Sequence, residues 1–376
     1  MKDVLAEKLL IKAMGWNLEE VDEELPQVLF LSKSKYDSYD NFMPGTRFLG
    51  SLAQWLHQFK TKEEKEKMFE FVKKKLVFIS SSQMSYLISL MYNTKVIPAI
   101  VQQVAALPDV NKFSIRKIQN SEEFKKHKRM SLFIGLSDGA HMDVIRRTSG
   151  LNNEQALNNY YPDNEKVEEL QKKLNETEYL SDDEKHFETV FLIDDFTASG
   201  TSFIRKKDGK YKGKLSKVFN NLFNIHSDDD GRHSNLHTLF GKKIRINILF
   251  CIATEKAIQR VENNIRQYLK DHEEDVKNLT IDWNVDCVQL LVEDVSNTIL
   301  NDQDLLNVIK QDDYCNPDDY EKDSFKEGAH EKHWLGFDEC ALPIVLSHNT
   351  PNNSILVLWQ SENEKIKSLF PRINRH

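Results

Sequence analysis

The chain has 376 residues, 40% of them hydrophobic, so it can bury one large core or two smaller ones without help from disulfides. Its net charge of −8 argues against wholesale wrapping by nucleic acid, although local basic runs leave room for contacts. The four cysteines are widely spaced without a CxxC pair, which disfavours a disulfide framework or a zinc ribbon and favours reduced thiols in the cytoplasm.

The N-terminal third is expected to be helical. Residues 64–79 and 83–92 repeat apolar side chains three and four positions apart, and turn residues are few in this part of the chain. We therefore expect residues 1–125 to form a helical N-terminal lobe.

The pattern of apolar and polar residues changes after Arg129. Short apolar runs rich in β-branched residues alternate with polar stretches of helical character, a pattern typical of an α/β domain with a mostly parallel sheet. The expected strands are residues 131–136, 189–195, 244–253 and 285–293. We assign residues 126–376 to this domain, with insertions.

The segment VFLIDDFTASGTS (190–202) places two acids and a loop of small residues at the end of a strand. Such a loop can bind a sugar phosphate, because its backbone N–H groups and the N-terminus of a following helix face the phosphate while the acids face hydroxyls. Asp194 and Asp195 would accept hydrogen bonds from two ribose hydroxyls. The alternative is a strand followed by a capped helix. The predicted phosphate loop is Ala198, Ser199, Gly200, Thr201 and Ser202.

LIDDFTASGTS resembles the phosphoribosyl pyrophosphate signature of type I phosphoribosyltransferases. The resemblance implies that Asp194 and Asp195 hold the ribose and that residues 198–202 cradle its 5′-phosphate. Purine-salvage members often carry a further acid at the position of Ala198, so a purine acceptor activated by that acid is not expected.

A second loop agrees with this resemblance. FIGLSDGAHMDVIRR (133–147) supplies a strand, a turn and a helix in the order of a pyrophosphate-binding loop. In a catalytic member pyrophosphate is displaced at the anomeric carbon of ribose, and Mg²⁺ arrives on the pyrophosphate, so few protein ligands to the metal are needed. The residues implied in pyrophosphate binding are Ser137, Asp138, Gly139, Arg146 and Arg147.

Together with LGFDECALPIVLSHNTPNNSILVLW (335–359), these two segments are similar to a divergent phosphoribosyltransferase-like family of bacterial conflict systems, including retron operons. The resemblance spans roughly residues 30–360 and implies an antiphage setting, with a reverse transcriptase and its RNA or DNA as partners. The alternative for the late segment is an Asn/Pro turn between two strands. The implied hood over the site is Phe337, His348, Asn349 and Asn352.

Two other functions use the same residues. Residues 135–139 satisfy G-x-S-x-G, so a serine hydrolase could use Ser137 with Asp294 and His348. Two points argue against a hydrolase. The helical region before this motif has no HGGG-like turn for an oxyanion hole, and a hydrolase mechanism assigns no role to residues 190–202. The other function is a non-catalytic nucleotide sensor or scaffold that binds a protein or nucleic-acid partner.

Two basic runs, residues 125–129 and 205–214, either form solvated faces or contact nucleic acid. The patterns GxxxxGK[ST], GxGxxG and HExxH are absent, so nothing favours P-loop hydrolysis, dinucleotide redox chemistry or zinc proteolysis. No stretch approaches the ~18 apolar residues of a membrane span, so we expect no membrane partner.

Overall fold

The computed structural model describes residues 3–225, 234–321 and 331–373. The chain forms two compact units: unit 1 joins Met1–Gln83 to Val292–His376, and unit 2 is Met84–Leu291. This division differs from the expected boundary at residue 125. The N-terminal helices share a core with the C-terminal segment, whereas helix α8 (Glu122–Arg129) contacts the strands of unit 2.

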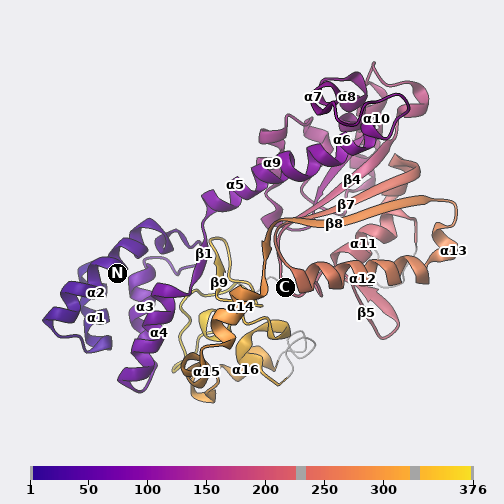
Figure 1. The fold of residues 1–376 in the computed structure, drawn as a ribbon. Coiled ribbons are helices and arrows are strands. Elements are labelled where there is room, and N and C mark those ends of the chain that lie inside the picture. Colours follow the sequence, from indigo (N-terminus) through magenta and orange to yellow (C-terminus); the bar gives the residue numbers. More distant parts are fainter. Residues whose placement is uncertain (1–2, 226–233, 322–330, 374–376) are drawn as a thin grey trace. The chain divides into compact units, whose positions relative to one another are not determined.

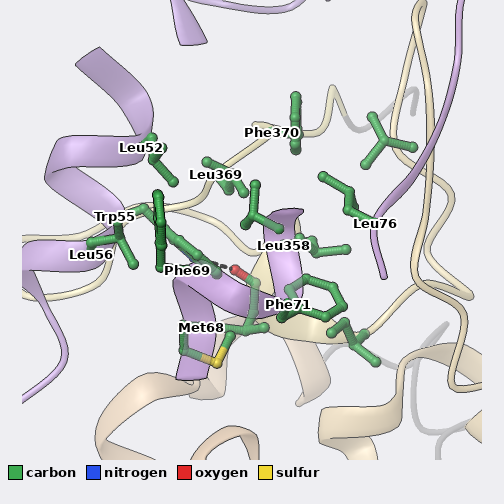
Figure 2. Packing of buried hydrophobic residues seen from close by; sticks show 14 of the residues in the cluster. Leu52, Trp55, Leu56, Met68, Phe69, Phe71, Leu76, Leu358, Leu369 and Phe370 are labelled. Carbon is green, nitrogen blue, oxygen red and sulfur yellow. Dashed lines mark hydrogen bonds between the residues drawn. The ribbon is translucent and has the colours of Figure 1, made fainter. Parts of the chain in front are cut away.

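Unit 1 is mainly helical, and its core joins the two ends of the chain. Figure 2 shows Trp55 and Phe71 from the N-terminal helices beside Leu358 and Phe370 from the C-terminal segment. The buried Trp55 indole donates a hydrogen bond to the Val357 carbonyl at 2.9 Å. The helices and strands of unit 1 are α1 (Asp3–Met14), α2 (Leu18–Ser34), α3 (Phe48–His57), α4 (Lys62–Lys74), β1 (Val77–Ile79), α14 (Glu293–Leu300), α15 (Gln303–Ile309), α16 (Pro317–Tyr320) and β9 (Ile344–Leu346).

One part of the helical expectation for residues 64–79 is wrong. Helix α4 begins with a capping box between Thr61 and Glu64, but it ends at Lys74. Residues 77–79 then form β1, which pairs in parallel with β9. The run Val-Phe-Ile suits a strand, and the distant partner β9 gives it one.

Unit 2 contains a five-stranded parallel sheet in the order β3-β2-β4-β7-β8, so the chain has the expected α/β fold. The strands are β2 (Ser131–Gly135), β3 (Ala156–Leu157), β4 (Phe187–Thr197), β7 (Phe240–Thr254) and β8 (Thr280–Leu291). The helices are α5 (Ser81–Met91), whose first three residues belong to unit 1, α6 (Ile97–Ala105), α7 (Ile115–Gln119), α8, α9 (Met142–Ser149), α10 (Asn164–Asn175), α11 (Lys214–Leu222), α12 (Glu255–Asp271) and α13 (Glu273–Val276). A separate hairpin joins β5 (Arg205–Lys207) to β6 (Lys210–Lys212).

Both faces of the sheet are covered, as expected for parallel strands connected by helices. Leu132, Val190 and Ile246 are neighbours in register and belong to a core that includes residues of α10, α11 and α12. Phe133 and Phe191 alternate with them and point to the opposite face, where their rings stack 4.8 Å apart. Figure 1 shows α11 and α12 on one side of the sheet and α6 and α9 on the other.

The cysteines and the helix lengths were also considered in the sequence predictions. All four cysteines are free and buried. Within the described ranges, every helix is too short or too polar to span a bilayer.

Candidate functional site

The two predicted loops lie at the point where the strand order reverses. The chain leaves β2, forms the edge strand β3, and then returns across β2 to form β4. Connections on the two sides of such a point diverge, and open α/β sheets bind ligands in the crevice at the carboxyl ends of these strands. The loop after β2 begins at Leu136, whose N–H donates to the Ile193 carbonyl of β4 at 2.8 Å. Topology therefore brings the two loops to the same edge of the sheet, after neighbouring parallel strands.

The paired acids of β4 have different surroundings. Consecutive residues of a strand point to opposite faces, so Asp194 and Asp195 cannot share one environment. Asp194 is fully buried at 0% exposure, and Asp195 is half-buried.

Asp194 joins three segments of the chain. One carboxylate oxygen accepts hydrogen bonds from the Ser137 hydroxyl and from the Asp195 N–H, the latter at 3.0 Å. The other accepts from the Lys214 ammonium at 2.5 Å. Burial raises the pKa of Asp194 to about 6; Lys214 opposes this shift and Asp195 adds to it. Asp194 thus ties the loop after β2 to the start of α11, with donors on both of its oxygens.

Asp195 lies against the backbone of the other loop. A Cβ atom placed on Gly139 would come within 2.4 Å of the Asp195 carboxylate, closer than real Cβ contacts allow. A glycine at position 139 is therefore required for this approach. The same neighbourhood affects Cys251, because burial and the two nearby acids raise the pKa of its thiol.

The loop at residues 198–202 is held from behind by side chains. Thr254 donates to the Ala198 carbonyl at 2.6 Å, and Arg260 donates to the Ser199 carbonyl at 2.8 Å. Gly200 has a φ of +74°, and a Cβ there would lie 2.9 Å from the Ala257 carbonyl of α12. Because protein donors bind these carbonyl oxygens, the dipoles that would repel a phosphate are directed into the protein.

The segment after this loop differs from expectation. The predicted helix does not follow directly; the β5–β6 hairpin intervenes, and α11 begins only at Lys214. The prediction that a helix begins directly after Ser202 and faces the phosphate is therefore wrong.

The loop after β2 borders a cavity of about 210 Å³. Ser137 and Asp138 line it together with Asp143, whereas Arg146 and Arg147 do not. Both arginines lie exposed in the last turn of α9, and Arg147 forms an ion pair with Asp143. Two carboxylates, Asp138 and Asp143, therefore line this cavity, and Asp143 is paired with Arg147.

No preformed metal cage accompanies these acids. In residues 3–225, 234–321 and 331–373, no group of three or more His, Cys, Asp or Glu side chains is placed to hold a metal ion. Asp138 and Asp143 line the smaller cavity, and carboxylate oxygens such as theirs are the ligands that Mg²⁺ prefers.

The predicted hood residues lie in unit 1, whereas both loops lie in unit 2. Within unit 1 they stabilise a turn: the Phe337 N–H donates to the Asn352 carbonyl at 2.8 Å, and the Asn349 side chain accepts from the Thr350 N–H at 3.0 Å. The His348 carbonyl accepts from Asn41 at 2.9 Å. After β9 this segment forms a turn and a short 3₁₀ helix rather than a second strand.

The hydrolase alternative loses support at Ser137. Its hydroxyl donates to the Asp194 carboxylate rather than to a histidine. The proposed partners Asp294 and His348 belong to unit 1, and Ser137 belongs to unit 2.

The basic run 125–129 is used for packing within unit 2. Lys126 pairs with Glu184 at 2.9 Å, and the Lys128 ammonium donates to the Ser149 carbonyl at 2.8 Å. Arg129 is 4% exposed and donates to the Thr177 hydroxyl at 3.0 Å. Contacts within unit 2 thus occupy Lys126, Lys128 and Arg129.

The sequence predictions missed Lys214 and the cavity beside it. This cavity has a volume of about 510 Å³, and Ser202, Arg205, Lys214 and Tyr160 are among the residues that line it. The available signal was the glycine before Lys214, which has a φ of +118° and lies against the Phe203 carbonyl.

Comparison with known proteins identifies the family of the chain. The chain matches the family model PRTase-CE over residues 52–372. No curated protein and no solved structure matches it. The matched residues include both loops and most of the two units, so the chain belongs to the PRTase-CE family and is a phosphoribosyltransferase-like protein.

Proposed function

We propose that the protein binds phosphoribosyl pyrophosphate, or a related nucleotide, with Mg²⁺ in the crevice between residues 137–141 and 198–202. One observation carries the proposal: both acids of β4 lie against the loop after β2, Asp194 through the Ser137 hydroxyl and Asp195 against Gly139, and the loop at residues 198–202 follows the same strand. A crevice at this point of a parallel sheet is where such folds bind ligands.

The geometry divides the roles of the two acids. We assign the hydrogen bonds to ribose hydroxyls to Asp195, because Asp195 is the more exposed of the two acids and Asp194 is fully buried with donors on both oxygens. Asp194 instead positions Ser137 and Lys214. The loop at 198–202 offers backbone N–H groups and hydroxyls to the 5′-phosphate, and its carbonyls are already bound from behind.

In the catalytic form of the proposal, pyrophosphate leaves the anomeric carbon of ribose as an acceptor nucleophile bonds to it. Mg²⁺ bound to the ligand would neutralise charge that develops on the leaving pyrophosphate. The chain orients the ribose through Asp195 and holds the pyrophosphate at the Ser137–Gly139 backbone. Asp138 and Asp143 supply oxygens toward the cation in the cavity that they line.

Isothermal titration of the full chain with phosphoribosyl pyrophosphate and Mg²⁺ tests this proposal, with ribose 5-phosphate and common nucleotides titrated in parallel. Asp195→Asn should weaken binding by about tenfold or more, because a charged acceptor of the ribose hydroxyls is lost. Asp282→Asn, an exposed acid on β8, is the matched control and should bind normally. Binding that is absent from the wild type, or unchanged in Asp195→Asn, would contradict the proposal.

An assay of pyrophosphate release distinguishes a transferase from a nucleotide sensor. Pyrophosphate release in the presence of candidate acceptors identifies a transferase. Saturable binding without release across the acceptors identifies the alternative, a nucleotide sensor or scaffold. In that case the Asp195→Asn variant should lose both binding and the downstream response.

A role in antiphage defence, with a retron reverse transcriptase and its RNA or DNA as partners, is a further proposal that rests on the sequence resemblance. Phage challenge of cells that express the chain with a reverse transcriptase encoded beside it tests this role. Protection that is equal with and without the chain would refute it.

A further inference from the structure

Strand β8 is a long edge strand of the parallel sheet in unit 2. The strand order ends at β8, whose 12 residues keep a single register against β7 from Thr280 to Leu291. Figure 1 shows β8 beyond β7 at this edge. In residues 3–225, 234–321 and 331–373, no other strand and no loop backbone forms hydrogen bonds with β8. Its outer side therefore presents unpaired N–H and C=O groups, which can pair with a further strand.

The first half of β8 lacks the usual protection of an edge strand. Natural sheets discourage pairing at an edge with lysine, proline or a bulge. The segment TIDWNVD (280–286) contains neither lysine nor proline, and no register shift interrupts its pairing with β7. Beyond it, the Asp286 carboxylate accepts from the Cys287 N–H at 2.7 Å and pairs with Lys95 at 2.8 Å. The open part of the edge is therefore residues 280–285.

The residues around Trp283 have a symmetric pattern. Ile281 and Val285 are apolar, and Asp282 and Asn284 are polar, at equal distances on either side of Trp283. Side chains alternate between the faces of a strand, so the three apolar residues share the face that packs on the core of unit 2. Asp282 and Asn284 lie exposed on the other face, and within the described ranges neither side chain has a hydrogen bond or an ion pair.

We infer that β8 pairs with β8 of a second copy of this chain, antiparallel and about a two-fold axis through Trp283. Such an axis places Asp282 of each copy opposite Asn284 of the other, so the amide can donate to the carboxylate twice. On the other face Ile281 lies opposite Val285, and the two Trp283 side chains meet at the axis. Aromatic and β-branched pairs of this kind stabilise antiparallel strands.

The symmetric pattern favours a second copy over a strand of another protein, because the chain itself supplies the complement of each residue. The charges also select the register. An axis through Asn284 would place Asp282 opposite Asp286, and an axis through Asp282 would place two copies of that acid opposite each other. Like charges directly opposite each other are destabilising, so both registers are disfavoured.

The inference goes beyond the proposed function and does not depend on it. Trp283 pairs with Ile246 in the first half of β7, whereas the two loops of the candidate site follow the carboxyl ends of β2 and β4. Two strands therefore separate this contact from the loop after β2. Phosphoribosyl pyrophosphate binding and pairing through β8 can thus be measured independently.

Sedimentation velocity of the full chain between about 1 and 100 μM tests the inference by measuring the dimer dissociation constant. Asn284→Asp places like charges opposite each other at two positions and should weaken the dimer by roughly 2- to 30-fold. Asn284→Lys places opposite charges there and should strengthen the dimer by a similar factor, a gain that misfolding cannot produce. Gln102→Glu and Gln102→Lys are the matched controls, because Gln102 is exposed on α6 in the same unit, and both should leave the constant unchanged.

Cysteine cross-linking tests the register. Residues directly opposite each other in an antiparallel pair have Cα atoms about 4.5–5.5 Å apart, which is within the range of a disulfide. The double variant Asp282→Cys/Asn284→Cys should therefore form a disulfide-linked dimer on mild oxidation, whereas neither single variant should, because its cysteine faces a residue that is not cysteine. The four native cysteines are buried and should not interfere.

Three results would overturn the inference: a monomer at every concentration, a dimer whose dissociation constant is the same in the Asn284 and Gln102 variants, or cross-linking of a single variant as readily as of the double variant. Circular dichroism confirms that each variant is folded. Titration of Asn284→Asp with phosphoribosyl pyrophosphate, expected to match the wild type, separates a failure of this inference from a failure of the proposed function.

Discussion

Lys214→Met tests the buried ion pair through which Asp194 ties the loop after β2 to the start of α11. Asp194 is fully buried, and Lys214 is the cation that binds its outer oxygen at 2.5 Å. In the wild type the pKa of Asp194 is raised to about 6, so the carboxylate is ionised at pH 8. Without Lys214 the buried carboxylate loses its counter-charge, and its pKa should rise further.

The magnitude follows from this difference in pKa. The pKa of Asp194 is 3.8 in the unfolded chain and about 6 in the folded protein, so the folded state binds the proton more tightly. The stability gained from this protonation is fully present below pH 3.8 and is lost as the pH rises through about 6. The wild type should stop losing stability above that point, whereas the variant should continue to lose about 1.4 kcal/mol per pH unit. Lys214→Met should therefore cost about 3 kcal/mol at pH 8 and close to nothing through this ion pair at pH 5.

Urea denaturation followed by circular dichroism at both pH values measures this cost. Hydrogen exchange of the β4 amides shows whether the loss lies in unit 2. Lys60→Met is the control, because Lys60 and Asp313 form an exposed ion pair with side-chain exposures of 61% and 58%. Such pairs contribute ~0–1 kcal/mol. A loss that is equal at pH 5 and pH 8, or no larger than the control, would refute this account of Asp194.

Three other substitutions or treatments test neighbouring features. Gly139→Ala should displace the Asp195 carboxylate, weaken phosphoribosyl pyrophosphate binding about tenfold by titration, and leave circular dichroism unchanged; normal binding would mean that this approach is unimportant. Thr254→Val should cost about 1–2 kcal/mol in urea denaturation, because Thr254 caps α12 and binds the Ala198 carbonyl; a loss within error would remove it from loop support. Cys251 should resist iodoacetamide at pH 8 until the protein unfolds, since burial raises the pKa of its thiol; rapid native-state labelling, located by mass spectrometry, would contradict this.

The strands that the sequence predicts are those with long apolar runs. The expected strands in residues 131–136, 189–195, 244–253 and 285–293 correspond to β2, β4, β7 and β8. The edge strand β3 is only Ala156–Leu157 in a polar stretch, so its pairing with β2 depends on tertiary contacts. The same holds for β1, whose partner β9 is distant in the chain.

The β5–β6 hairpin and the different roles of Asp194 and Asp195 could not be predicted from local sequence patterns. Cations are poor strand formers, so residues 205–212 gave a charge signal and not a strand signal, although the Asp208–Gly209 pair is a hairpin turn signal. Strand alternation places Asp194 and Asp195 on opposite faces. Only the position of Lys214 on α11 shows which of the two is buried and ion-paired.

The opposite orientations of Asp194 and Asp195 affect how loss-of-function variants in this family should be interpreted. A double Asp-to-Asn change looks like a direct way to inactivate the site. Here it would also leave Lys214 without its carboxylate, and a drop in cellular abundance would then be mistaken for lost activity. A change at Asp195 alone separates recognition of the ligand from the integrity of the scaffold, and genetic studies of the family should use that single substitution.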